Sequence, residues 1–259
     1  LDPYLEKEYT LECFQENYGV SDKKPVEIKL SIPKFKTTVK PINLPSIAEL
    51  PDSSAAKQYI ISRQLPESSY KNLYFAEDFK QFVEEISGEV LNKTGPRVII
   101  PFFSKSGELV AFQGRAIDSD PMRYVTIKID PDSPKIFGLN TVNDKSPIMV
   151  CEGPFDSLFI PNCIATADSN LSIASTVFPK DKLILVPDNE PRNTSILKNI
   201  RKFINNGFSV CLFPESFEHK DINDAIKSGL STTELLDIIN NNTFNGLRAE
   251  LEFVKWRKL

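Results

Sequence analysis

Carboxylate side chains follow apolar runs at three places in this sequence. Glu152 and Asp156 come after residues 148–151, Asp188 and Glu190 come after residues 183–186, and Asp221 comes after residues 208–213. Carboxylate oxygens are the ligands that Mg²⁺ prefers, and protein-bound Mg²⁺ often bridges to substrate phosphates. Two such ions can stabilise the attacking and leaving oxygens of an in-line phosphoryl transfer. The acids therefore predict magnesium-dependent chemistry on a phosphate group.

The apolar runs are predicted to be strands buried on both faces, because each is short, continuous and bounded by turn residues. Strands that alternate with helices form a parallel sheet, and ligands bind outside the carboxyl ends of its strands. We therefore expect the acids to meet at one edge of a sheet. The predicted strands are 148–151, 163–166, 183–186 and 208–213, and the predicted helices are 156–160, 171–178, 193–206, 222–227, 232–239 and 247–257.

The sequence upstream of Lys145 has a different pattern. Helices are predicted from residue 53 and over residues 77–86, and then strand-forming runs follow at 97–103, 108–116, 122–129 and 135–139. The four residues at 104–107, ending in Gly107, are typical of a hairpin turn. We expect four segments: an N-terminal helix and proline-rich linker (1–51), an upstream subdomain (52–144), a catalytic domain (145–231) and C-terminal helices (232–259). Within the first segment, a helix is expected at 1–20 and an edge strand at 26–30.

Composition excludes several classes of protein. The 259 residues carry a formal net charge of −4, so global charge gives no support for nucleic-acid binding, although carboxylates in a metal site contribute to this total. No run of about 18 apolar residues is present, so no membrane span is predicted. The four cysteines are far apart and His219 is the only histidine, so no zinc site and reduced intracellular thiols are expected. The chain starts without Met, so we expect a fragment or a processed form.

The ordered acidic segments resemble the TOPRIM domain of topoisomerases, primases and some nucleases. The E-G signature is met by Glu152-Gly153 and extended by Asp156. The D-x-D signature is met by Asp188-Asn189-Glu190, with Glu190 in place of the second aspartate, and Pro191-Arg192 follow where small residues are usual. The third segment, K-D-x-x-D/E in primases, is met by residues 220–224.

The upstream block is similar to the N-terminal half of a bacterial-type primase core, particularly in the primases of T4-like bacteriophages. The similarity to primase cores lies in GELVAFQGR at 107–115, RYVT at 123–126 and KIFGL at 135–139. The similarity to T4-like primases lies further in GPFDSLFIPNCIATADSNL and LRAELEFVKWRKL. The resemblance implies an α/β fold, with a TOPRIM domain whose parallel central sheet is flanked by helices, preceded by a smaller mixed α+β basic subdomain. In that family a zinc-ribbon domain precedes the core, and no zinc is expected in this fragment.

The resemblance also implies a function and its partners. The expected activity is synthesis of short RNA primers on single-stranded DNA from ribonucleoside triphosphates, with Mg²⁺ or Mn²⁺ as cofactor. A replicative helicase is the expected protein partner, in the cytoplasmic replisome of a phage-infected cell. The expected catalytic residues are Glu152, Asp156, Asp188 and Glu190, the metal ligands are Glu152, Asp188, Glu190 and Asp221, and the nucleotide or template contacts are Arg115, Arg123, Tyr124, Lys128, Lys135 and Lys220. Glu152 is the expected general base.

Other interpretations stay open for several of these residues. Asp156 and Asp221 each precede or open a predicted helix and could be N-caps. Glu190 could be a solvated loop acid, and the basic side chains of residues 122–129 could form an ordinary solvent-exposed strand face. A TOPRIM nuclease or a non-catalytic nucleic-acid-binding module are the alternative functions. The basic upstream block favours a primase over a nuclease, because a nuclease binds no incoming triphosphate.

Overall fold

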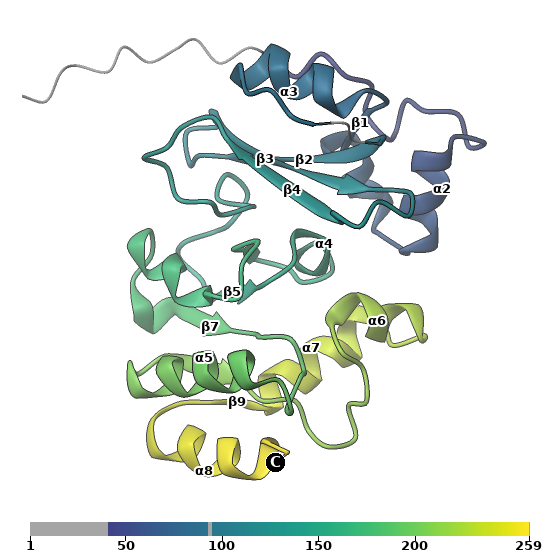
Figure 1. Ribbon diagram of the computed structural model, residues 1–259. Coiled ribbons are helices and arrows are strands. Elements are labelled where there is room, and N and C mark those ends of the chain that lie inside the picture. Colours follow the sequence, from purple (N-terminus) through teal and green to yellow (C-terminus); the bar gives the residue numbers. More distant parts are fainter. Residues whose placement is uncertain (1–40, 93–94, 259) are drawn as a thin grey trace, which may run out of the picture. The chain divides into compact units, whose positions relative to one another are not determined.

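The structure is a computed structural model that describes residues 41–92 and 95–258. All of these belong to one compact unit, which contains an antiparallel sheet and a largely parallel sheet (Figure 1). The helix expected at 1–20 and the strand expected at 26–30 lie outside the described residues. No helix among the residues that are described is long and apolar enough to cross a membrane.

The antiparallel sheet has the strand order β1-β2-β3-β4. Its elements are α2 (Ala55–Ser62), the 3₁₀ helix η1 (Glu67–Asn72), β1 (Tyr74–Ala76), α3 (Phe79–Ser87), β2 (Arg97–Phe103), β3 (Leu109–Ala116) and β4 (Tyr124–Lys128). The expected hairpin joins β2 to β3, and Gly107 in its turn has a φ of 83°, which glycine adopts without strain. The helices and the first three strands predicted for this half are present, whereas η1 and β1 were not predicted.

Gly114 in β3 has no side chain, so Phe79 and Arg97 can pack closely against this strand. A Cβ atom at Gly114 would lie 2.5 Å from the Phe79 ring and 2.9 Å from Cδ of Arg97. Arg97 is fully buried, donates to the Gly114 carbonyl at 3.0 Å and pairs with Asp120 at 2.6 Å. The glycine of the F-x-G-R run thus leaves space for a buried, paired arginine, which is how a charge is tolerated in a core.

The second sheet has the order β6-β5-β7-β8-β9, and its first four strands are parallel. Its elements are β5 (Ile148–Cys151), α4 (Pro154–Ser157), β6 (Cys163–Ala165), the 3₁₀ helices η2 (Leu171–Thr176) and η3 (Lys180–Lys182), β7 (Leu183–Leu185), α5 (Thr194–Asn205), β8 (Ser209–Cys211), α6 (Ile222–Lys227), α7 (Thr232–Asn241), β9 (Thr243–Phe244) and α8 (Gly246–Trp256). The alternation of buried strands and helices is confirmed. The two-residue β9, which adds an antiparallel edge, was not predicted because its pattern is too short.

Two predicted elements differ in type. Residues 171–178 form a 3₁₀ helix over Leu171–Thr176 instead of an α-helix, in a stretch rich in serine and threonine, which favour local hydrogen bonds to the backbone. Of the run 135–139, only Phe137 makes a β-bridge, with Ala165 at the edge of β6. This run joins the two halves of the molecule instead of extending either sheet.

A shared apolar core connects the two sheets. One cluster of buried side chains combines Val98, Ile100 and Phe102 of β2 with Phe155 and Phe213 from the parallel half. The rings of Phe102 and Phe137 also meet edge to face, with centroids 5.7 Å apart. The two sheets are therefore held together by one set of packed apolar side chains. The four-segment division of the chain stays a prediction.

Candidate active site

Three adjacent strands of the parallel sheet bring the acidic segments to one edge. In the order β5-β7-β8, the chain leaves β5 at Glu152, leaves β7 just before Asp188, and leaves β8 on the way to Asp221. Parallel strands share the edge at which their carboxyl ends lie, so acids far apart in sequence become neighbours.

Glu152 and Asp188 are half-buried, and each carboxyl group is costly to ionise. Burial, followed by the charge of Glu152, raises the pKa of Asp188 to about 8. Burial also raises the pKa of Glu152, although the Asp188 backbone donates to its carboxylate. Oε1 of Glu152 is buried and has no hydrogen-bond partner. Two carboxylates and an unsatisfied oxygen in one place are unfavourable unless a cation or proton joins them.

Asp156 lies close to Gly153 and to the start of α6. Its pKa is raised to about 7, first by burial and then by the charge of Asp221. Oδ1 of Asp156 accepts the backbone N–H of Asn223 at 2.9 Å. A Cβ atom at Gly153 would collide with Oδ2 of Asp156. A side chain at the glycine of the E-G signature would therefore displace the Asp156 carboxylate.

The helix-cap interpretation holds for Asp221 and not for Asp156. Asp221 is the N-cap of α6 and accepts the backbone N–H of Asp224 at 2.8 Å. Helix α4 has Gly153 as its N-cap, so Asp156 lies inside the first turn and does not cap its own helix. Both carboxylates nevertheless face the N-terminal N–H groups of α6, which favours negative charge at that position.

Glu190 is turned toward cationic and amide partners. Its Oε1 pairs with Nζ of Lys220 at 2.7 Å, and its Oε2 accepts from Nδ2 of Asn193 at 2.7 Å. The hydrogen bonds from Asn193 and Lys220 lower its pKa. Lys220 also lies near Asp188, whose pKa it lowers in part. Lys220 is thus a cation close to both Asp188 and Glu190.

The chemistry of these acidic residues suits a magnesium ion, but their side chains are not arranged as a complete ligand set. Among the residues that the structure describes, no three acidic, histidine or cysteine side chains already converge as a ligand set. The oxygen-only donor set suits Mg²⁺, and the buried, unpartnered Oε1 of Glu152 is an open ligand position next to Asp188. To bind a metal here, Asp221 would have to leave the backbone N–H of Asp224, or Glu190 would have to leave Lys220.

A stack of arginines and tyrosines from the antiparallel half lies near Asp156. Arg115 donates from Nε to the Tyr59 hydroxyl at 2.7 Å, and its guanidinium lies 4.3 Å from the Tyr124 ring centroid. Arg63 lies 6.0 Å from the Tyr59 centroid. Arg63 and Asp156 both affect the pKa of Tyr124, which burial raises. Tyr124, with Arg115 packed over its ring, therefore lies within electrostatic range of Asp156.

Tyr59 and Arg63 were missed by the sequence analysis. They lie on and just after α2, where the helical pattern explained them as helix residues without a further role. Arg63 has a buried Nε with no partner, so it can still donate one hydrogen bond. The only sequence signal was two polar side chains four residues apart, which puts them on one helix face.

The other expected basic contacts are more dispersed. Arg123 lines a cavity of about 590 Å³ together with Arg115 and the loop between β3 and β4. Lys128 lies at the far end of β4 from Tyr124, and its Nζ donates to the Pro131 carbonyl at 2.7 Å. Lys135 pairs with Asp168 at 3.8 Å, and Asp168 in turn is near enough to Glu152 to raise its pKa.

Solved structures with the same fold are bacterial primase cores. The Aquifex aeolicus primase, solved with its zinc-binding and RNA polymerase domains, aligns with a TM-score of 0.56 at 20% identity over 78% of this chain. This chain spans 63% of that longer chain. The DnaG primase catalytic domain bound to single-stranded DNA aligns with a TM-score of 0.56 at 14% identity, over 75% of this chain and 74% of that one. The expected α/β TOPRIM-containing primase fold is confirmed.

The family follows from sequence similarity. No family model matches the chain. The DNA primase of Enterobacteria phage T4 is 33% identical over 268 aligned residues, which cover 100% of this chain and 76% of the T4 protein. The chain therefore belongs to the DNA primase family, whose members are replication enzymes.

Proposed function

We propose that this chain makes short RNA primers on single-stranded DNA by magnesium-dependent phosphoryl transfer. The observation that carries the proposal is the acidic edge of one sheet facing the arginine–tyrosine stack of the other. Membership of the DNA primase family favours this function over the nuclease and the non-catalytic alternatives. Ribonucleoside triphosphates are the proposed substrates, with Mg²⁺ as cofactor and Mn²⁺ as a substitute.

The acidic residues would hold the metal, and one of them would accept a proton. Glu152, Asp188, Glu190 and Asp221 are the proposed ligands, and Asp156 keeps the α6 N-terminus in place beside them. Bound Mg²⁺ supplies charge neutralisation at the transferred phosphoryl group. Glu152 is the proposed acceptor of the 3′-hydroxyl proton, because its Oε1 is unpartnered and because burial raises its pKa, which makes it a stronger base than an exposed glutamate.

The basic and aromatic residues would position the nucleic acid and the triphosphate. Arg63 and Arg115 offer guanidinium groups for phosphate oxygens, which they can bind through two hydrogen bonds at once. The Tyr124 side chain is 46% exposed and can stack on a base without regard to its identity. Arg123, Lys128, Lys135 and Lys220 are proposed as further phosphate contacts at more dispersed positions.

The proposed partners beyond substrate follow from the family. The neighbour solved with single-stranded DNA supports a DNA template for this chain. The replicative helicase is proposed by resemblance alone. We likewise propose the cytoplasmic phage replisome as the place of action, in keeping with the phage T4 relative.

Isosteric removal of the two central charges tests the proposal. Glu152→Gln and Asp188→Asn should each abolish dinucleotide synthesis on a single-stranded template with Mg²⁺, because each removes a charged oxygen ligand. Loss of a primary ligand should reduce the rate by about 10²-fold or more, consistent with its role in charge stabilisation. The measurement is incorporation of labelled nucleotide by the full chain.

Glu250→Gln, an exposed acid on α8, is the matched control and should keep normal synthesis. Circular dichroism of all variants establishes that they are folded. Near-normal synthesis by either Glu152→Gln or Asp188→Asn would show that these acids do not form the metal site.

A further inference from the structure

We propose that the indole of Trp256 is a positioning group for the acidic site and acts on it through Asn189. Helix α8 would then take part in metal binding although it carries none of the ligands. The proposal rests on the proposed metal-binding role of Glu152 and Asp188. It starts from a set of hydrogen bonds at the one residue between Asp188 and Glu190.

Asn189 is hydrogen-bonded on every side. Its Nδ2 donates to the carbonyls of Phe217 at 2.8 Å and His219 at 3.0 Å, and its backbone N–H donates to the Lys220 carbonyl at 2.7 Å. These three bonds fasten the loop after β7 to the loop after β8. The two loops carry Asp188 and Asp221, so Asn189 sets the separation of acids that repel each other.

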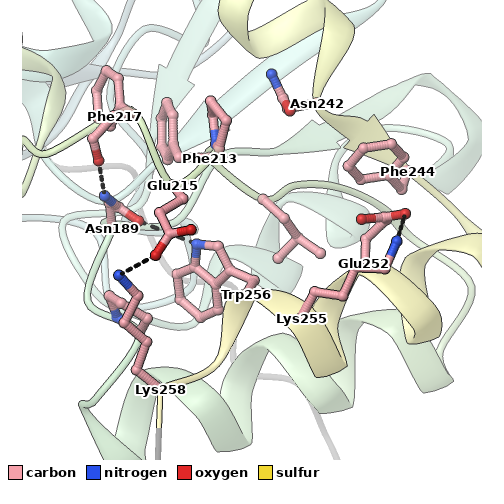
Figure 2. A pocket seen from close by; sticks show the side chains of 13 residues that line it. Asn189, Phe213, Glu215, Phe217, Asn242, Phe244, Glu252, Lys255, Trp256 and Lys258 are labelled. Atoms are coloured by element: carbon pink, nitrogen blue, oxygen red, sulfur yellow. Dashed lines mark hydrogen bonds and ion pairs between the residues drawn. The ribbon is translucent and has the colours of Figure 1, made fainter.

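Trp256 completes this group of bonds from the C-terminal helix. Its Nε1 donates to Oδ1 of Asn189 at 3.1 Å, across 67 residues of sequence (Figure 2). The backbone N–H of Lys258 donates to the Pro191 carbonyl at 2.9 Å. The C-terminal segment is thus bonded to the loop on both sides of Glu190.

Helix α8 is itself firmly placed. Phe253 is buried and stacks with Trp256, with ring centroids 6.4 Å apart and an interplanar angle of 27°. Arg201 of α5 lies 5.7 Å from the Phe253 ring centroid, which ties α8 to the helix beside it. A rigid helix can transmit position to Asn189, whereas a loose one could not.

The indole also borders a cavity of about 300 Å³. Figure 2 shows this cavity among Phe213, Phe217, Phe244 and Trp256, with the ion pairs Lys258–Glu215 and Lys255–Glu252 at its rim. Packing therefore does not enclose the ring on all sides. The bond to Asn189 fixes the orientation of the indole, and the same bond holds the amide of Asn189 in the orientation that serves both loops.

The test compares Mn²⁺ affinity among variants of the full chain. Trp256→Phe keeps an aromatic ring and removes only the N–H donor, and Asn189→Ala removes the whole group of side-chain bonds. Both should weaken Mn²⁺ binding, measured by electron paramagnetic resonance, by about 10-fold, as loss of an outer-shell partner does. The double variant should be no weaker than Asn189→Ala alone, because both changes break one connection. Val254→Ala, at an exposed position of α8, should bind Mn²⁺ normally.

Trp256 is the only tryptophan of the chain, so its fluorescence gives a second readout. This readout is measured on the unaltered chain and does not depend on whether a variant folds. Mg²⁺ should shift the emission of the unaltered chain, with half-saturation at the concentration that supports half-maximal synthesis. Unchanged Mn²⁺ affinity in folded Trp256→Phe, or emission that does not respond to Mg²⁺, would overturn the positioning role. Asp188→Asn separates the two proposals: if it keeps full Mn²⁺ affinity, the metal site itself is wrongly assigned, whatever Trp256 does.

Discussion

At the scale of single residues, the strongest feature is the cost of ionising neighbouring acids. Asp156 and Asp188 have pKa values of about 7 and about 8, both raised first by burial and then by other carboxylates. Perturbed groups of this kind are frequent at functional sites, because a metal or substrate that offsets the repulsion binds with a corresponding gain. Glu190 shows the opposite, since Asn193 and Lys220 already satisfy its charge.

The raised pKa of Asp188 predicts a pH-dependent stability without metal. A carboxyl that binds its proton more tightly in the folded chain contributes full stability below its ordinary pKa of 3.8, and this is lost as the pH rises toward about 8. In EDTA above pH 8, Asp188→Asn should therefore melt higher than the unaltered chain by about 2–4 °C, the shift that ~1 kcal/mol produces in a protein of this size. Calorimetric melting at pH 4 should show no difference. A difference that is constant from pH 4 to pH 8 would contradict the assigned cause.

Arg63 offers a second prediction at this scale. Its guanidinium lies beside the Tyr59 ring and near Asp156, where it can contribute a charge-assisted hydrogen bond to a phosphate oxygen. Arg63→Ala should therefore raise the Kd for single-stranded DNA or for a triphosphate by about 10-fold, the loss of ~1.4 kcal/mol expected for one such bond. Fluorescence anisotropy of a labelled oligonucleotide measures it. Arg248→Ala is the control, because Arg248 also lies over an aromatic ring, that of Phe244, but on the exposed surface of α8. Equal effects of the two changes would remove Arg63 from the site.

At the scale of elements, the turn from β5 into α4 places two acids with very little chain. Gly153 has an ordinary φ of −88°, so its role is not backbone freedom. It leaves room for the Asp156 carboxylate, which then reaches the N-terminus of α6. The E-G-x-x-D spacing is thus explained by one close contact, between Gly153 at the N-cap of α4 and the side chain of Asp156 in the first turn.

Gly153→Ala is predicted to displace Asp156 without distorting the backbone. Synthesis should fall by about 10²-fold, as when a site group is moved by about an ångström, while the melting temperature changes little. Gly107→Ala makes the informative contrast, because its φ of 83° is strained for alanine yet open space surrounds it. That variant should lose about 1 kcal/mol of stability and keep its activity. Normal synthesis by Gly153→Ala would mean that the position of Asp156 is unimportant.

At the scale of the whole molecule, the site is built from two halves that must stay in register. Asn223 links them directly, because its backbone N–H donates to Asp156 and its Nδ2 donates to the Arg63 carbonyl at 2.6 Å. The shared apolar cluster that includes Phe102 and Phe155 also packs the two halves together. A template held by one half and a metal held by the other would depend on this link.

Asn223→Ala should therefore affect binding as well as stability. Removing the buried amide leaves the Arg63 carbonyl unpaired and should cost about 1–3 kcal/mol in the free energy of unfolding. Denaturant titration measures that loss, and oligonucleotide anisotropy should show weaker DNA binding. Asn199→Ala, which breaks hydrogen bonds to Ser169 within the parallel half, should lose stability and keep DNA affinity. Normal DNA binding by folded Asn223→Ala would contradict the link.

The sequence by itself determined the local part of this protein. Buried strands, helices and turns follow from apolar periodicity and from turn residues such as Gly107, so most elements and the order of the acidic segments could be predicted. These properties depend on near neighbours in the chain. The 3₁₀ helix at Leu171–Thr176 and the short β9 show where local signals are too weak.

Only the tertiary structure decided which side chains meet. Sequence placed Glu190 with the other acids, but only the structure shows that its carboxylate also pairs with Lys220. Nothing local distinguished Arg63 from any other helix-end arginine. The bond from Trp256 to Asn189 spans 67 residues and could not be inferred from spacing. Periodicity determines which face of an element is buried, but side-chain partners depend on how separate elements pack, and that is a property of the whole fold.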